Sequence, residues 1–248
     1  MKKRIFINLA MAIFLFGMLL NANAEYRIVV GETGIYCRSE NGRITGVMCD
    51  LAEEMIKRMG YTNKMQMVPH RRLKAMMKMK ATKTFYIPSS RNQSNNKDLQ
   101  FVVEMLKDEY VVVTATNSTF DGSTIEAAKQ FRYVSILGGS EAEEVAKHLL
   151  PNIDSSSSQE ECAKKLNASH VEGWISTWNG ARYTAKSLGI DPSSLKRGAK
   201  IMDANLAVFG TPDIPIEEIE KWRATFTALK ADGTVNRVFK QYDIQLNE

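Results

Sequence analysis

The sequence has few of the residues from which metal and catalytic sites are usually built. Its 248 residues include three cysteines and three histidines, and these six do not stand at the spacings typical of zinc ligands. The sequence shows no nucleophile–base motif and no glycine-rich phosphate loop. We therefore expect no metal, no cofactor and no enzymatic activity.

The sequence also lacks a large excess of either positive or negative charge. The chain has 33 Lys and Arg residues against 28 Asp and Glu, a formal net charge of +5. Three of the basic residues lie in residues 1–24, which contain no acidic residue, so the remaining 224 residues carry a charge of only +2. This balance argues against nucleic acid or a membrane surface as the partner.

The one long hydrophobic run lies at the start of the chain. Lys2 to Arg4 precede an apolar stretch from Ile5 to Leu20, and Ala22-Asn23-Ala24 then fits a small-x-small cleavage site. A membrane anchor is the alternative, but a spanning helix needs about 20 apolar residues and this run is shorter. We predict a signal peptide over residues 1–24 and export to the periplasm, without lipid attachment because no cysteine stands at the cleavage point.

Short apolar segments alternate with amphipathic ones along the rest of the chain, which predicts an α/β fold with parallel sheets. Strands are expected over residues 26–31, 64–68, 84–88, 109–116, 133–137, 171–176 and 204–209. Helices are expected over residues 50–59, 70–80, 141–150, 159–167 and 180–188. Asp50 and Glu53 fit a capping box at the start of the first of these helices.

The three cysteines permit one disulfide. Cys37 and Cys49 flank a hairpin that is expected to turn at Asn41-Gly42, so they can approach within bridging distance. A bridge and two free thiols both remain open. Cys162 lies on a predicted helix beside Leu166, and we expect it to be a small buried residue.

The end of the chain predicts two helices separated by a short break. Helical spacing relates Ile216, Ile219, Trp222, Phe226 and Leu229, and then Val235, Val238, Phe239 and Tyr242. Between them Gly233 suits a left-handed conformation and Thr234 can cap the second helix. The D-G-T break and the final K-x-Y resemble the end of the bacterial family 3 extracellular solute-binding proteins.

Four further segments carry the same resemblance, which covers nearly all of the chain after residue 24. They are Gly42 to Leu51 (G-x-x-x-G-x-x-x-D-L), Val68 to Leu73, Gly138-Gly139-Ser140, and Trp174 to Gly189. The resemblance implies a type II periplasmic-binding-protein-like fold, in which two α/β lobes are joined by two crossover strands. Lobe 1 would comprise residues 25–111 and 207–248, and lobe 2 residues 112–206.

The resemblance also places a ligand in the cleft between the lobes. The residues predicted to bind it are Glu32, Tyr36, His70, Arg72, Ser90, Arg91, Gly139, Ser140, Trp178 and Asn179. Gly139 and Ser140 open a helix whose free amides suit an anion, although Ser140 can equally do no more than cap that helix. Arg91 can clamp a carboxylate. For Arg91 and the other charged and aromatic residues, plain packing or solvent exposure is the alternative.

Two positions depart from the family pattern. Members that bind amino acids often carry an Arg where this chain has Asn95, and an Asp where it has Trp178-Asn179. These departures weaken the case for an ordinary α-amino acid. Trp178 can instead stack on a flat or cationic solute.

The expected function is capture of a small polar solute, an amino acid or a related amine or carboxylate, by hinge closure. The partner would be the membrane permease of an ABC transporter, and we expect a monomer. One alternative is a ligand-sensing periplasmic protein that docks on a membrane receptor. The other is a cyclohexadienyl-type dehydratase on the same fold, for which Glu32 or Glu172 would have to act as the acid.

Overall fold

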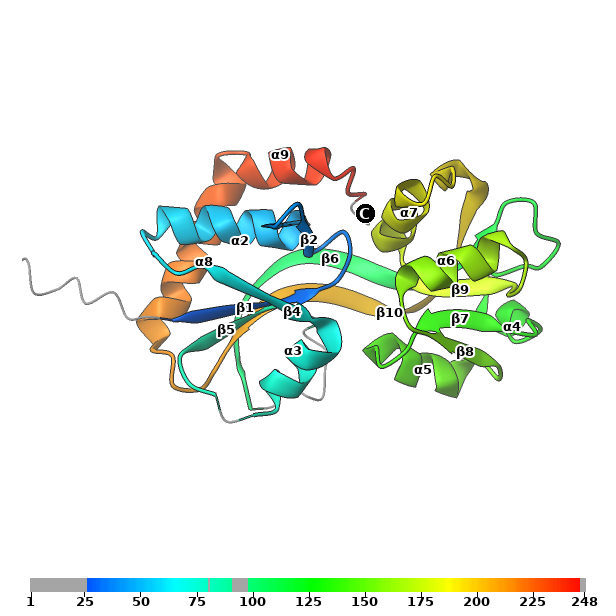
Figure 1. The fold of residues 1–248 in the computed structure, drawn as a ribbon, viewed down its shortest axis with the longest axis horizontal. Helices are drawn as coiled ribbons and strands as arrows, with labels where there is room; N and C mark the ends of the chain where they lie inside the picture. Colours follow the sequence, from blue (N-terminus) through cyan, green and yellow to red (C-terminus); the bar gives the residue numbers. More distant parts are fainter. Residues whose placement is uncertain (1–25, 80, 91–97, 246–248) are drawn as a thin grey trace, which may run out of the picture.

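The computed structural model shows two α/β lobes side by side that share one eight-stranded sheet (Figure 1). It describes residues 26–79, 81–90 and 98–245. The predicted signal peptide therefore lies outside the described residues. Within those residues, no helix is both long enough and apolar enough to cross a membrane. The strand order of the sheet is β4-β1-β5-β10-β6-β9-β7-β8.

Lobe 1 holds the first five strands and the last two helices. Its elements are β1 (Arg27–Glu32), β2 (Arg38–Glu40), β3 (Arg43–Thr45), α2 (Val47–Arg58), β4 (Met65–Pro69), α3 (His70–Met77), β5 (Thr84–Ser90), α8 (Ile216–Ala231) and α9 (Thr234–Gln241). Strand β1 pairs in parallel with β4 and β5. The larger core lies under α2, α8 and α9, where the Phe85 and Trp222 rings are 4.8 Å apart. Helix α3 covers the other face with Leu73 and Met77.

Lobe 2 is built from the middle of the chain. Its elements are α4 (Ile125–Ala128), β7 (Val134–Leu137), α5 (Glu141–Leu149), β8 (Ile153–Ser156), α6 (Gln159–Asn167), β9 (Gly173–Thr177), α7 (Trp178–Ser187) and the 3₁₀ turn η2 (Pro192–Ser194). Strand β7 pairs in parallel with β8 and β9. One core lies under α4 and α5 around Phe131 and Ile136, and the other lies under α6 and α7 around Trp174.

Two long strands, β6 (Gln100–Ala115) and β10 (Leu195–Gly210), connect the lobes. They pair antiparallel with each other, and β10 reaches β5 in lobe 1 while β6 reaches β9 in lobe 2. The two lobes and two crossover strands implied by the resemblance are therefore confirmed. The sheet is mixed, so the expectation of parallel sheets holds only within each lobe.

Some strands were mispredicted from the sequence for a common reason. Strands β6 and β10 begin at Gln100 and Leu195, about nine residues before the apolar runs that predicted them. Their first halves carry charged residues, including Lys107 and Lys196, which are exposed and mask the strand pattern. Strand β8 was missed because its sequence, IDSS, contains a single apolar residue.

The structure decides the cysteine alternatives. Cys37 and Cys49 form a disulfide with their Cα atoms 5.3 Å apart. The hairpin between them turns at Asn41-Gly42, where both residues have positive φ angles of 51° and 75°. Cys162 is buried with a free thiol, as predicted.

The predicted capping box does not form, because α2 begins at Val47, three residues before Asp50. Gly46 stands at the N-cap with a φ of 117°. A Cβ atom there would lie 2.7 Å from the Tyr36 carbonyl oxygen, so the close approach of two backbone segments requires glycine. Glu53 pairs with Arg43 on the surface instead of reaching back to the helix start.

At the break between α8 and α9, the structure confirms the predicted conformation of Gly233 but not the predicted cap at Thr234. Gly233 is left-handed with a φ of 79°, as predicted. Thr234 does not cap α9 but is its first residue. Its amide donates to the Asp232 carboxylate over 3.0 Å, so the acidic residue of the D-G-T break receives the first free amide of the helix.

The final tyrosine of the K-x-Y motif binds the start of α2. The Tyr242 hydroxyl donates to Asp50 over 2.5 Å and accepts from the Gly46 amide over 3.0 Å. It also lies 2.8 Å from the Thr45 hydroxyl. A single hydroxyl group therefore joins the segment after α9 to the start of α2.

We predict that Tyr242→Phe lowers the free energy of unfolding by about 1–3 kcal/mol, because Asp50 and the Gly46 amide lose their partner. Urea unfolding measures this difference. Tyr183→Phe is the matched control, since the Tyr183 hydroxyl has no hydrogen-bond partner among the described residues. That change should cost less than about 0.5 kcal/mol. Equal losses in the two variants would contradict the assignment.

Candidate functional site: the cleft between the lobes

A cleft of about 650 Å³ lies between the lobes, within the size range of small-molecule sites. Lobe 1 lines it with residues 32–39 after β1 and with Pro69 to Arg71 at the start of α3. Lobe 2 contributes the starts of α5 and α6, the Thr177 cap of α7 and one face of α7 from Gly180 to Ser187. The connecting strands close the base with Tyr110 of β6 and Leu206 of β10.

Four helices, α3, α5, α6 and α7, begin at the cleft. Helix N-termini present free amides and a partial positive charge. Ser140, Ser158 and Thr177 cap α5, α6 and α7 by accepting one of these amides. Pro69 precedes α3 and supplies no side-chain cap. Of the four, α3 is therefore the helix whose amides are least satisfied by its own chain.

A buried carboxylate, Asp108 of β6, organises the base of the cleft. It is 1% exposed and accepts from the Asn179 amide over 2.9 Å and from the Glu109 backbone amide over 2.7 Å. The Tyr36 hydroxyl lies 2.6 Å from both Asp108 and Thr177. A carboxylate only accepts, so Tyr36 donates to Asp108 and receives the Thr177 hydroxyl. The network ties the loop after β1 to the connecting strand and to α7.

Burial shifts several pKa values at this base away from their usual ranges. It raises the pKa of Asp108, and together with the adjacent carboxylate it raises the pKa of Tyr36 well above its usual value. Burial, with Glu141 and Asp108 nearby, raises the pKa of Tyr110 to about 12. Tyr110 is therefore a neutral phenol at physiological pH, and its hydroxyl has no hydrogen-bond partner within the described part of the chain.

The far edge of the cleft carries a second set of contacts between the lobes. From α3, Arg71 donates to the Gly138 carbonyl over 3.2 Å and Lys74 donates to the Gly139 carbonyl over 3.1 Å. Burial lowers the pKa of Lys74. Glu143 holds this turn by accepting the Gly139 amide over 2.6 Å. The lobes therefore touch on both sides of the cleft, so the structure is of the closed arrangement.

Four of the ten predicted residues line the cleft: Glu32, Tyr36, His70 and Ser140. Their contact with a ligand stays a prediction. The Tyr36 hydroxyl is already bonded to Asp108, and the residue is 6% exposed and packs in the larger core of lobe 1. Ser140 caps α5 and lines the cleft as well, so both of the roles considered for it fit its position.

Arg72 and Gly139 do not line the cleft, but the residue before each of them does. Arg72 is exposed and does not line the cleft, whereas its neighbour Arg71 does, because successive residues on a helix point about 100° apart. The Gly139 amide is bonded to Glu143 and is not free for an anion. Gly138 lines the cleft in its place.

Trp178 and Asn179 do not line the cleft but bind Gln245 near the end of the chain, so their contact with a ligand stays a prediction. Trp178 Nε1 donates to the Gln245 side chain over 3.0 Å. Asn179 donates to the Gln245 carbonyl over 3.0 Å and accepts its amide over 2.8 Å. Arg91, Asn95 and the Ser90 side chain lie outside the described residues, so the predictions on them stay open.

Several residues that line the cleft were not predicted from the sequence. They are Arg38, Arg71, Tyr110, Thr177 and Tyr183. The predicted strand over residues 109–116 carried one usable signal, because a tyrosine stands at the start of its β-branched run. The other residues have no local signal, since only the approach of the lobes makes them neighbours.

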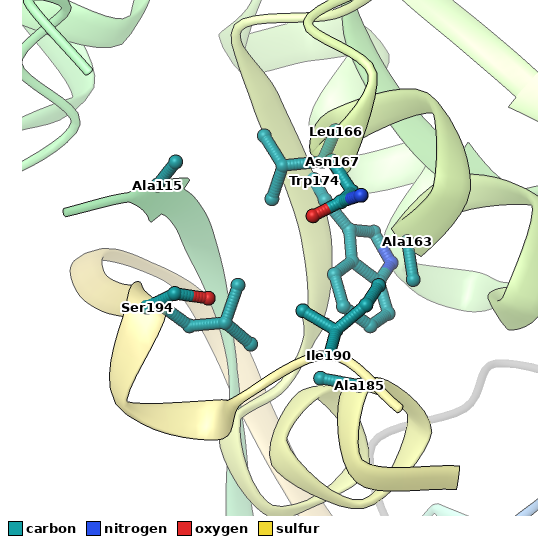
Figure 2. Close-up of a pocket in the computed structure, with 9 residues that line it drawn as sticks. Ala115, Ala163, Leu166, Asn167, Trp174, Ala185, Ile190 and Ser194 are labelled. Carbon is teal, nitrogen blue, oxygen red and sulfur yellow. The ribbon is translucent and has the colours of Figure 1, made fainter. Parts of the chain in front are cut away.

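A second pocket, in lobe 2, is too small for a solute (Figure 2). It has a volume of about 20 Å³ and is lined mainly by apolar groups around Trp174, Leu166 and Ile190. This is room for about one water molecule. Among the described residues, no group of three or more His, Cys, Asp or Glu side chains is placed to hold a metal ion.

Many solved structures share this architecture. A histidine kinase sensor domain with similarity to periplasmic binding proteins superposes with a TM-score of 0.75 at 12% identity, over 91% of this chain and 99% of that chain. The substrate-binding protein of an amino acid ABC transporter gives 0.70 at 14% identity, over 88% and 99%. An ancestral arginine-binding protein bound to arginine gives 0.70 at 16%, over 88% and 97%.

The fold is that of the type II periplasmic-binding-protein-like domains. The sequence itself matches no protein-family model and no curated protein sequence. At identities of 12% to 16% the similarity is one of fold. The chemistry of the cleft must therefore be argued from its own residues.

We predict that His70 makes the protein less stable in acid. Burial lowers the pKa of His70 from 6.5 to about 4, and its Nδ1 is buried without a partner among the described residues. The unfolded chain binds a proton more readily, so stability is full above about pH 6.5 and falls as the pH drops towards 4. The loss attributable to this group is up to about 3 kcal/mol.

His70→Phe keeps an aromatic ring and removes the titration. Urea unfolding at a series of pH values should show the free energy of unfolding of the variant falling less steeply between about pH 6.5 and 4 than that of the wild type. Above about pH 7.5, where the imidazole is neutral in both states, the difference between the two proteins should be constant. Parallel curves down to pH 4 would show that His70 is not buried as described.

Proposed function

We propose that the protein captures a small polar solute in the cleft by hinge closure. The supporting observation is that three cleft-lining residues carry polar groups without a hydrogen-bond partner among the described residues. These groups are Arg38 Nη1, His70 Nδ1 and the Tyr110 hydroxyl, and the first two are buried. Buried polar groups are normally paired, so a polar molecule bound in the cleft would complete these interactions.

The connecting strands support the hinge. Each lobe has its own hydrophobic cores, and β6 and β10 are the strands shared by both. Bending of two strands can open the cleft without exposing either core, as in other two-lobed binding proteins. The lobes make contact mainly through side-chain hydrogen bonds, which an opening motion can exchange for water.

Charges of both signs line the cleft. Arg38 and Arg71 are the cations, and Glu32, Glu141 and Glu160 are the anions. Such a mixture suits an amino acid or a related amine or carboxylate. The same fold is used by an arginine-binding protein and by a substrate-binding protein of an amino acid ABC transporter, which supports this class of solute.

We extend the proposal to location and partner. Residues 1–24 would act as a signal peptide that delivers the protein to the periplasm, and the closed form would be presented to an ABC-type permease. The sensing alternative uses the same cleft, and a histidine kinase sensor domain shares the fold. A gene for a membrane receptor beside this one would favour sensing, whereas genes for a permease and an ATPase would favour transport.

A thermal-shift screen of amino acids, amines, organic acids and sugars tests the binding proposal. A solute present at 100 times its dissociation constant should stabilise the protein by about 2.7 kcal/mol, which raises the melting temperature in proportion. Isothermal titration then gives the affinity. No shift with any of the four classes would contradict capture of a small polar solute.

The cleft assignment has its own test. Tyr110→Phe should weaken binding of the solute found by roughly fivefold, since a net hydrogen bond contributes about 1 kcal/mol. Tyr133→Phe makes the same change on a tyrosine that is 54% exposed and does not line the cleft, and it should leave the affinity unchanged. Equal affinities of wild type and Tyr110→Phe would remove Tyr110 from the site.

We also propose that the protein binds its solute without transforming it. A periplasmic dehydratase on this fold would need a general acid in the cleft. Incubation with prephenate or arogenate should therefore leave both compounds unchanged, as followed by chromatography of the mixture. Conversion of either compound at a rate above the buffer control would make the protein an enzyme.

A further inference from the structure

The last described residues, 243–245, cross from lobe 1 to lobe 2. Helix α9 packs in the lobe 1 core, and Ile244 packs against the same core. From there the chain reaches the first turns of α7, where Asn179 brackets the Gln245 backbone with two hydrogen bonds of 2.8 Å and 3.0 Å. In Figure 1 the chain that follows α9 runs towards α7.

Two more residues of α7 bind the same segment. Trp178 Nε1 donates to the Gln245 side chain over 3.0 Å. Arg182 contacts Asp243 twice, with 2.6 Å to the carboxylate and 3.2 Å to the backbone carbonyl. The Arg182 side chain is 19% exposed and the Asp243 side chain 74% exposed, so the ion pair lies at the surface, between α7 and the chain segment after α9. Five hydrogen bonds therefore run between α7 and two residues of this segment, Asp243 and Gln245.

These bonds are connected to the base of the cleft through one side chain. Asn179 is 2% exposed, and its amide nitrogen donates both to the Gln245 carbonyl and to Asp108. Asp108 in turn receives the Tyr36 hydroxyl from lobe 1. Because buried polar groups that lose a partner are destabilised, release of the chain end would weaken the contacts at the cleft base as well.

We infer that residues 243–245 are a strap that holds lobe 2 against lobe 1 and so biases the protein towards its closed form. A strap that favours one of two conformations shifts their populations whether or not a solute is present. Detaching it would open the lobes and speed the release of anything held in the cleft. The inference deepens the proposed function, since the strap would regulate the same cleft.

The test measures the distance between the lobes in the absence of solute. Spin labels on Lys57→Cys of α2 and Lys186→Cys of α7, both exposed positions on different lobes, report that distance by double electron–electron resonance in a Cys162→Ala background. A chain ending at Tyr242 lacks the strap, and a chain ending at Gln245 keeps it. The first should show distances shifted to longer values and more broadly distributed, and the second should match the full chain.

A second variant covers the case in which the shorter chain loses stability with Ile244. Trp178→Phe combined with Arg182→Ala removes three of the five hydrogen bonds and leaves the chain end intact. It should shift the distances in the same direction, with circular dichroism unchanged. Unchanged distances in this variant and in the chain ending at Tyr242 would overturn the strap. Because no solute is used, this outcome is independent of whether the ligand screen succeeds.

Discussion

The buried carboxylate of Asp108 constrains the structure more than any other group. It lies on β6 where the chain passes between the lobes, and at 1% exposure it needs donors in place of water. Those donors come from Tyr36 in lobe 1, from Asn179 in lobe 2 and from the amide of Glu109. The requirement therefore brings together three segments that are far apart in the sequence, and the base of the cleft forms where they meet.

The walls of the cleft are the surfaces of the two lobes that face each other on either side of this base. Most apolar residues of each lobe are buried in that lobe's own cores, with Tyr183 of α7 packing across onto the core of lobe 1, so most of the facing surfaces are free to be polar. At one edge Arg71 and Lys74 bind the carbonyls of the β7–α5 turn, and at the other edge the chain end binds α7. Contacts of this kind exchange readily with water, as the proposed opening of the cleft requires.

Local patterns in the sequence predicted much of the fold. Helix α6 runs over the predicted residues 159–167, because its apolar positions and the cap at Ser158 lie within one short segment. The Cys37–Cys49 bridge was one of two alternatives that the turn and the helix start left open, and the structure shows that it forms. The connecting strands were predicted too short, since their exposed charged halves lack the alternation that identifies a strand.

The site was predicted less completely than the fold. Glu32, Tyr36, His70 and Ser140 stand at the ends of strands or the starts of helices, and these positions face the cleft wherever the two lobes meet. Trp178 and Asn179 stand at an equivalent position but turn towards the chain end. They differ from the four cleft-lining residues because Gln245 binds beside them. Gln245 lies 66 residues from Asn179 along the chain, so the sequence around Asn179 does not predict this contact.

The sequence by itself determined the alternation of strands and helices, the hairpin that turns at Asn41-Gly42 and the helix pair that ends the chain. Each of these depends on hydrophobic periodicity or turn chemistry within some 20 residues. Only the tertiary structure decided which polar residues face the cleft and which hold the lobes together. Those roles depend on partners more than 60 residues away, such as Tyr36 for Asp108, and the free energy of burying a polar group is set by those partners and not by its neighbours in the chain.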